Sequence, residues 1–232
     1  MRLDKFLSKN TTLSRKDVAK QIRLGQVTVD GIKTTKIDQK IDETKNQIAV
    51  CGNLIAFNKY TYIMLNKPLG VVSATTDGKQ KTVLDLLPAQ YKKLKLFPCG
   101  RLDKDTLGLI ILTNNGIGAH KLLSPKNHVP KTYEFVCAEK LSSDDIVELE
   151  QGIQLKDGLI TKPCKLELEN ETKGNITITE GKYHEIKRMF GAIGNKITFL
   201  KRISFGSIIL DPNLKEGEFR PLTDAEKIIF EL

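Results

Sequence analysis

The chain has 232 residues, of which 40% are hydrophobic and 28% are charged, and its net charge is +9. This length and composition are typical of a soluble globular protein with two domains, and they exclude disordered and fibrous classes. No apolar run approaches the roughly 20 residues that span a bilayer, and the start shows no signal-peptide core, so we expect no membrane contact and a cytoplasmic location.

Cysteine and histidine usage gives no sign of a metal or a disulfide framework. The four cysteines are scattered, form no CxxC pair, and are accompanied by only three histidines. Gly78-Lys79 invites a phosphate-loop interpretation, but the required earlier glycine and following hydroxyl residue are missing. We therefore expect neither a metal nor a cofactor.

The excess positive charge is concentrated at one end of the chain. Residues 1–60 hold 12 Lys/Arg and 6 Asp/Glu, which accounts for +6 of the net +9. A uniformly basic surface would not distribute its charge in this way. The pattern favours a polyanionic partner for this segment.

The N-terminal pattern predicts two short helices followed by a strand. Apolar residues recur at helical spacing over residues 2–9, and Ser14 with Asp17 is a typical helix start. Gly25 ends the second helix, and residues 27–31 read as a strand and a tight turn. Cations on the wet faces of both helices are candidates for binding an RNA backbone: Arg2, Lys5, Arg15, Lys16, Lys20 and Arg23. The alternative is a solvated helix face without a partner.

Residues 33–59 are polar with scattered apolar positions, which indicates short strands of the same module and then a linker. We therefore place a first domain at residues 1–58 and a second at residues 61–232. In the second domain, residues 62–73 predict a strand, a turn and a strand, with Lys67 at the break. Short helices are predicted at 82–87 and 118–123, and a capped helix after Ser142.

The remaining pattern of the second domain is mostly strands. They are predicted at residues 131–137, 159–160, 164–168 and 176–179, before a helix whose apolar positions include 186, 189, 190 and 193. A final capped helix begins at Thr223. The fold class is therefore α+β, with short helices on a mixed, mainly antiparallel sheet.

A charged loop at residues 100–106 leads directly into an apolar run at 107–113 that predicts a buried strand. A carboxylate at the lip of such a strand is held rigidly and can still face a cleft, which suits catalysis. Asp103 and Asp105 both qualify, and spacing alone does not choose between them. A solvated turn aspartate is the alternative.

Residues 100–109, GRLDKDTLGL, resemble the GRLDxxTxGL signature of the pseudouridine synthases. The resemblance implies that Asp103 is the catalytic residue. Residues 180–190 (EGKYHEIKRMF) resemble a second family motif, whose Lys or Arg pairs with that aspartate, here Lys187. The sequence KTY at 131–133 resembles a landmark whose tyrosine, here Tyr133, stacks on the target base and offers a phenol oxygen for proton transfer.

Other segments agree in the same order along the chain. The N-terminal sequence resembles the S4 RNA-binding domain, and GEFRPLT at 217–223 resembles the branch of the family that acts on the small ribosomal subunit. The resemblance implies a monomeric, cofactor-free enzyme that flips out and isomerises one uridine of 16S ribosomal RNA. Arg101 and Arg188 are expected to contact the RNA. The resemblance leaves open whether Asp103 attacks C1′ of the ribose or first takes a proton from C2′.

Two other functions remain possible from the sequence: a sister synthase acting on 23S rRNA, and a catalytically silent protein that binds rRNA during assembly. Glu185 stands where this branch usually has Gln. We expect its extra negative charge to weaken RNA docking or to repel Asp103.

Overall fold

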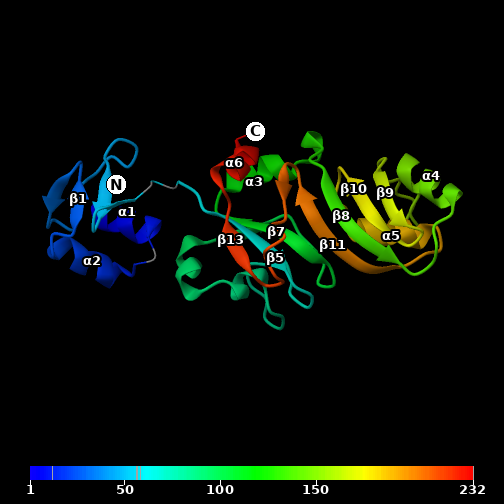
Figure 1. The fold of residues 1–232 in the computed structure, drawn as a ribbon, viewed down its shortest axis with the longest axis horizontal. Coiled ribbons are helices and arrows are strands. Elements are labelled where there is room, and N and C mark those ends of the chain that lie inside the picture. The colour runs from blue at the N-terminus through cyan, green and yellow to red at the C-terminus, as the bar shows by residue number, and fades with distance from the viewer. Residues whose placement is uncertain (12, 56, 58, 232) are drawn as a thin grey trace. The chain divides into compact units, whose positions relative to one another are not determined.

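The computed structural model describes residues 1–11, 13–55, 57 and 59–231. The chain divides into two compact units, Met1–Tyr60 and Thr61–Leu232 (Figure 1). Asn58, where the sequence analysis ends the first domain, lies outside the described residues. None of the helices in the described ranges has the length and apolarity that a membrane span requires.

The first unit packs two helices against a small antiparallel sheet. The helices are α1 (Leu3–Asn10) and α2 (Arg15–Arg23). The sheet has the order β2-β1-β3-β4, and its strands are β1 (Val27–Val29), β2 (Ile32–Thr34), β3 (Ile48–Val50) and β4 (Asn53–Leu54). Apolar side chains from both helices and from β1 and β3 form one buried core.

Local sequence signals set the boundaries of these elements. Ser14 accepts a hydrogen bond from the Asp17 backbone nitrogen and caps α2, as expected. After α2 the chain turns at Gly25, whose φ is +63°. Asp30 and Gly31 both have positive φ and form the two-residue turn between β1 and β2. The helices, strand and turn predicted for residues 2–31 are thus confirmed.

The second unit is built on one twisted sheet. In the described part of the chain this sheet has nine strands, in the order β13-β5-β7-β11-β8-β10-β9, with β12 added beside β11 and β6 beside β7 (Figure 1). Their bounds are β5 (Tyr62–Lys67), β6 (Phe97–Cys99), β7 (Leu107–Thr113), β8 (Lys131–Cys137), β9 (Lys165–Asn170), β10 (Lys173–Ile178), β11 (Ile197–Phe205), β12 (Ile208–Ile209) and β13 (Phe219–Pro221). Only β7 and β11 pair in parallel among these strands. The expected mixed, mainly antiparallel sheet is confirmed.

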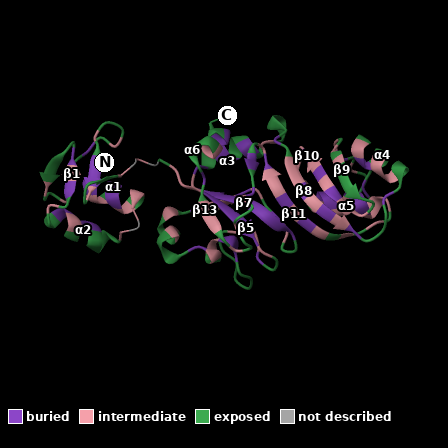
Figure 2. Ribbon diagram, viewed as in Figure 1, coloured by how far each residue is buried: buried purple, intermediate pink, exposed green. Residues whose placement is uncertain are grey.

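Short helices cover both faces of this sheet. They are α3 (Gly116–Leu123), α4 (Ser143–Gln151), α5 (Glu185–Ala192), α6 (Asp224–Lys227) and the 3₁₀ helices η1 (Val83–Leu86), η2 (Ala89–Leu94), η3 (Pro125–Asn127) and η4 (Ile228–Phe230). Alternate residues of β7 belong to two separate cores: Ile110 and Leu112 to one, Leu109 and Ile111 to the other. All seven residues of β7 are buried, and Figure 2 shows the strand as buried along its length. Burial on both faces explains its unbroken apolar sequence.

Two short predicted strands are wrong. In the expected strand at 71–73, Val72 makes only an isolated bridge to Thr82. In the expected strand at 159–160, Ile160 makes only a bridge to Gln154, because a tight turn folds residues 155–159 back on themselves. The predicted helix at 82–87 is a 3₁₀ helix that Thr82 caps. The helix predicted at 118–123 begins earlier, at Gly116, because Asn115 caps it.

The cysteines do not pair. All four are free thiols; Cys51 is exposed in the first unit, Cys99 and Cys137 are buried, and Cys164 is half-buried.

Candidate active site

The loop between β6 and β7 carries Asp103 and is fastened to the core at several points. The Ser73 hydroxyl donates to the Leu102 carbonyl oxygen at 2.7 Å and accepts from the Leu102 nitrogen at 3.0 Å. The Thr106 nitrogen donates to the Asp103 carbonyl oxygen at 3.1 Å. The backbone on both sides of the acid is therefore held before any substrate arrives.

Lys67, at the end of β5, holds the same loop through hydrogen bonds to backbone carbonyl groups. Its side chain is fully buried, and its Nζ donates to the carbonyl oxygens of Thr106 at 2.8 Å, Pro68 at 3.0 Å and Lys104 at 3.4 Å. Burial lowers the pKa of Lys67 to about 8, while the negative charges of Asp103 and Asp105 oppose that shift. Lys67 is not among the predicted catalytic residues, and its three backbone carbonyl partners fit a structural role.

The loop lies beside β11 because of a glycine in β7. Gly108 has φ +101°, and a Cβ at this position would lie 2.3 Å from the Arg202 carbonyl oxygen. Leu107 and Gly108 pair in parallel with Lys201 and Arg202. This close approach places the charged loop against the strand that follows α5.

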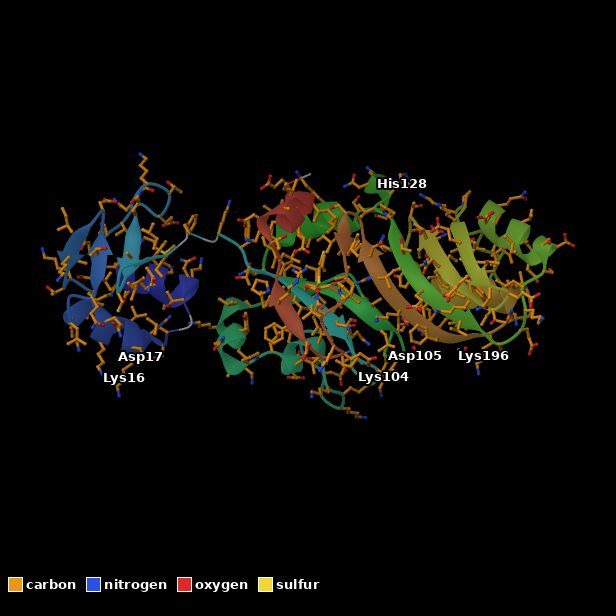
Figure 3. All side chains as sticks on the ribbon, in the orientation of Figure 1. Lys16, Asp17, Lys104, Asp105, His128 and Lys196 are labelled. Atoms are coloured by element: carbon orange, nitrogen blue, oxygen red, sulfur yellow. The ribbon has the colours of Figure 1, made fainter. Side chains whose placement is uncertain are left out.

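Lys187 projects from α5 to two carboxylates of the loop. Its Nζ lies 3.1 Å from Asp103 Oδ2 and 2.5 Å from Asp105 Oδ1; Figure 3 labels Lys104 and Asp105 on this loop. Burial lowers the pKa of Lys187, but hydrogen bonds to Asp105 and Asp103 outweigh it and raise the pKa above its ordinary value. Buried Ile186, Met189 and Phe190 fix the inner face of α5 and turn Lys187 towards the loop.

His184 also contacts Asp103, although it is not among the predicted site residues. Its Nε2 lies 3.4 Å from Asp103 Oδ1. His184 is the residue before α5 and has a left-handed backbone, with φ +49°. Helical spacing to Lys187 gives no signal for this contact, because His184 precedes the helix and its backbone is left-handed.

Tyr133 lies on β8, where it pairs with Ile176 on one side and Arg202 on the other. Only 7% of its surface is exposed. It lines one small open hollow of about 70 Å³ together with the acid, the cations and apolar residues, among them Arg101, Asp103, Thr106, His184, Lys187 and Leu200. The structure thus brings Asp103, Tyr133 and Lys187 together from three separate segments.

Glu185 is buried, which disfavours the negative charge that we expected there. It is 4% exposed, and its Oε2 accepts a hydrogen bond from the Lys182 nitrogen at 2.8 Å. Burial and the neighbouring Glu180 raise the pKa of Glu185 to about 8. Burial thus favours the protonated form of Glu185, which opposes the expected repulsion of Asp103.

The predicted RNA-binding cations differ in whether their side chains already pair with an acid. Arg2, Lys5, Arg15, Lys16, Lys20 and Arg23 are all exposed. Lys16, Lys20 and Arg23 line one open hollow of about 610 Å³ on α2, where Figure 3 labels Lys16 and Asp17. Arg2 is engaged by Asp4 at 3.0 Å.

In the second unit, Arg101 is exposed, whereas the Arg188 guanidinium forms an ion pair with Asp157. Across the ranges that the structure describes, no three His, Cys, Asp or Glu side chains gather in a way that could hold a metal ion.

Comparisons with known proteins agree on one family. Residues 61–192 match the family described as RNA pseudouridylate synthase. A Bacillus subtilis protein named uncharacterized RNA pseudouridine synthase YtzG is 45% identical, over 97% of this chain and 96% of its own. Ribosomal small subunit pseudouridine synthase A of Escherichia coli K12 is 40% identical, over 97% of this chain and 98% of its own. A solved structure described as a pseudouridylate synthase superimposes with a TM-score of 0.70 at 37% identity and covers 99% of both chains.

Proposed function

Because this chain belongs to the RNA pseudouridylate synthase family, we propose that it isomerises one uridine of 16S ribosomal RNA. The chain resembles a solved pseudouridylate synthase over 99% of its length. The choice of 16S rRNA rests on full-length relatives from several bacteria that are named for the small subunit. We expect the reaction to take place in the cytoplasm, where ribosomes are assembled.

One observation carries the proposal: the Lys187 ammonium lies 3.1 Å from the Asp103 carboxylate, in a hollow that Tyr133 also lines. The reaction breaks the bond from C1′ to N1 of uracil and joins C1′ to C5; C5 then loses a proton and N1 gains one. An ionised carboxylate can attack C1′ or take a proton from C2′. The Lys187 ammonium places a positive charge beside that carboxylate.

We assign Tyr133 and the predicted Lys and Arg residues to binding of the RNA. The target base must leave its stack, at a cost of a few kcal/mol, and stacking on Tyr133 would offset part of that cost. We assign Arg101 and Arg188 to contacts beside the target. We propose that the first unit is an S4-type domain whose six exposed cations bind the rRNA backbone, and that the enzyme acts as a monomer, on an assembly intermediate of the small subunit.

The experiment compares Asp103→Asn with Asp105→Asn. Both remove one carboxylate from Lys187, so they match in charge and size. Asp103→Asn is expected to keep the fold and RNA binding and to abolish pseudouridine formation, measured as tritium release from 16S rRNA labelled at uracil C5. Asp105→Asn is expected to keep turnover. Turnover by Asp103→Asn would reject the catalytic assignment.

The substrate is tested by mapping pseudouridine in both large rRNAs of a strain that lacks the gene. One missing pseudouridine in 16S rRNA is the expected result. A missing site in 23S rRNA would replace the substrate and leave the family unchanged. A complete set of modifications in both RNAs would favour a silent binding protein.

A further inference from the structure

Tyr183 is an exposed aromatic residue directly before His184 in the chain. It is 73% exposed, and it is the one aromatic residue among the exposed large hydrophobic side chains of the described residues. Single exposed aliphatic residues are ordinary on protein surfaces. A tyrosine ring combines a large flat apolar face with a polar hydroxyl group, which suits it to contact a ligand at a wet surface.

The ring lies at the rim of the active site. Tyr183 stacks on His184, with ring centroids 3.8 Å apart and an angle of 20° between the planes. His184 in turn reaches Asp103, with Nε2 3.4 Å from Oδ1. A chain of contacts therefore runs from an exposed ring through a second ring to the acid. His184 covers one face of the tyrosine, and the rest of the ring is open to solvent.

The turn that carries the two rings is fastened before RNA binds. The Lys182 nitrogen donates to Glu185 Oε2 at 2.8 Å, and Lys182 Nζ donates to the Ile160 carbonyl oxygen at 3.1 Å. Arg188 Nη1 donates to the Tyr183 carbonyl oxygen at 3.4 Å. A ring that is already fixed loses little conformational entropy when a ligand stacks on it.

The surrounding charge indicates what would stack there. Exposed Arg101 lines the same hollow as His184. Lys182 and Arg188 are nearby in the chain, where they already pair with Glu180 and Asp157. Cations match a phosphate backbone, and an open aromatic face matches a nucleobase. Each nucleotide of an RNA strand carries both a phosphate and a base, so one strand can contact the cations and the aromatic ring together.

We infer that Tyr183, backed by His184, is the stacking platform for the base next to the target uridine. The inference rests on the proposed function, because the target uridine enters the adjacent hollow. Every base has an aromatic face, so the platform holds the strand in place without reading its sequence.

The test compares Tyr183→Ala with Tyr183→Phe, using 16S and 23S rRNA transcripts as probes. Tyr183→Ala is expected to raise Kd about 5- to 150-fold, the range for loss of one base–aromatic stack. Tyr183→Phe keeps the ring and is expected to bind like the wild type. The dependence of Kd on salt should keep its slope, because no cation is removed. Ile117→Ala, which truncates a 70% exposed residue on α3, is the control and should change nothing.

Several results would overturn the inference. Wild-type affinity of Tyr183→Ala would exclude a stack, and equal losses in Ala and Phe would point to the hydroxyl group. A lower kcat at saturating RNA with unchanged Kd would make Tyr183 a support for His184 only. If the wild type modifies 23S rRNA instead, the substrate proposal fails, whereas weaker binding of Tyr183→Ala to that transcript would still support the platform.

Discussion

At the scale of single residues, one ammonium group organises the charges of the site. Lys187 contacts both acids of the loop, although 84 residues separate it from Asp103 along the chain. No local periodicity connects positions so far apart, and only the resemblance of two motifs to one family linked them. The sequence also could not show that Lys67 is buried. Its burial depends on three backbone carbonyl partners, and a strand pattern does not predict such partners for a lysine.

Glu185 leads to a prediction about pH. Its pKa rises from an ordinary 4.5 to about 8 in the folded protein. Between those values the folded state holds a proton that the unfolded chain releases, so the free energy of unfolding should fall as pH rises. The pKa of Glu180 is lowered from its ordinary 4.5, so its opposite contribution to the slope lies below that range of pH.

Glu185→Gln removes this titrating group while keeping the shape of the side chain. We expect the decline of Tm between about pH 5 and pH 8 to become flatter than in the wild type. Thermal unfolding across that range measures it. Glu148→Gln, on the exposed surface of α4, is the control and should leave the slope as it is. An unaltered slope in Glu185→Gln would show that Glu185 is ionised in the folded protein.

At the scale of elements, patterns with long buried runs predicted the fold well. The strands at 107–113 and 131–137 have the predicted bounds: the first is buried along its whole length, and the second alternates between half-buried and buried residues. The expected strands at 71–73 and 159–160 failed because two or three residues pair only if a distant partner is available. That partner is a property of the tertiary fold and leaves no local signal.

The approach of β7 to β11 yields a second prediction. Gly108→Ala would drive a Cβ into the Arg202 backbone and strain a φ of +101°. We expect a loss of about 2–4 kcal/mol in the free energy of unfolding, measured by urea denaturation. Gly191→Ala is the matched control, because its Cβ meets no atom within 4 Å in helix α5. It should gain about 0.5–1 kcal/mol. Equal changes in the free energy of unfolding for the two variants would mean that β11 shifts to accept the added Cβ without destabilising the protein.

At the scale of the whole molecule, charge and chemistry are separated between two units. The first unit carries most of the net charge, and the second carries Asp103, Tyr133 and Lys187. Composition predicted where the charge lies, since the excess of Lys and Arg is visible in residues 1–60, whereas the family resemblance predicted the three site residues. The identity of the RNA was not predictable from charge, because phosphates bind cations without regard to sequence.

Replacing Lys16, Lys20 and Arg23 together by Gln tests that division in the full chain. If each contacts one phosphate, the slope of log K against log salt should fall by about 0.7–0.9 per residue. The kcat at saturating rRNA should stay near the wild-type value. Lys45→Gln, at an 82% exposed lysine 3.9 Å from Asp42, is the control and should leave the slope nearly unchanged. A wild-type slope in the triple variant would move the rRNA contact away from α2.

The distribution of thiols has a practical consequence. Burial raises the pKa of Cys99 and of Cys164 to about 12, and it also raises that of Cys137, so these three hold almost no reactive thiolate near pH 7. Cys51, exposed between β3 and β4, is then the preferred target for a maleimide dye. The unaltered protein can thus receive a single fluorescent reporter on its basic unit, and the isomerase unit stays unlabelled.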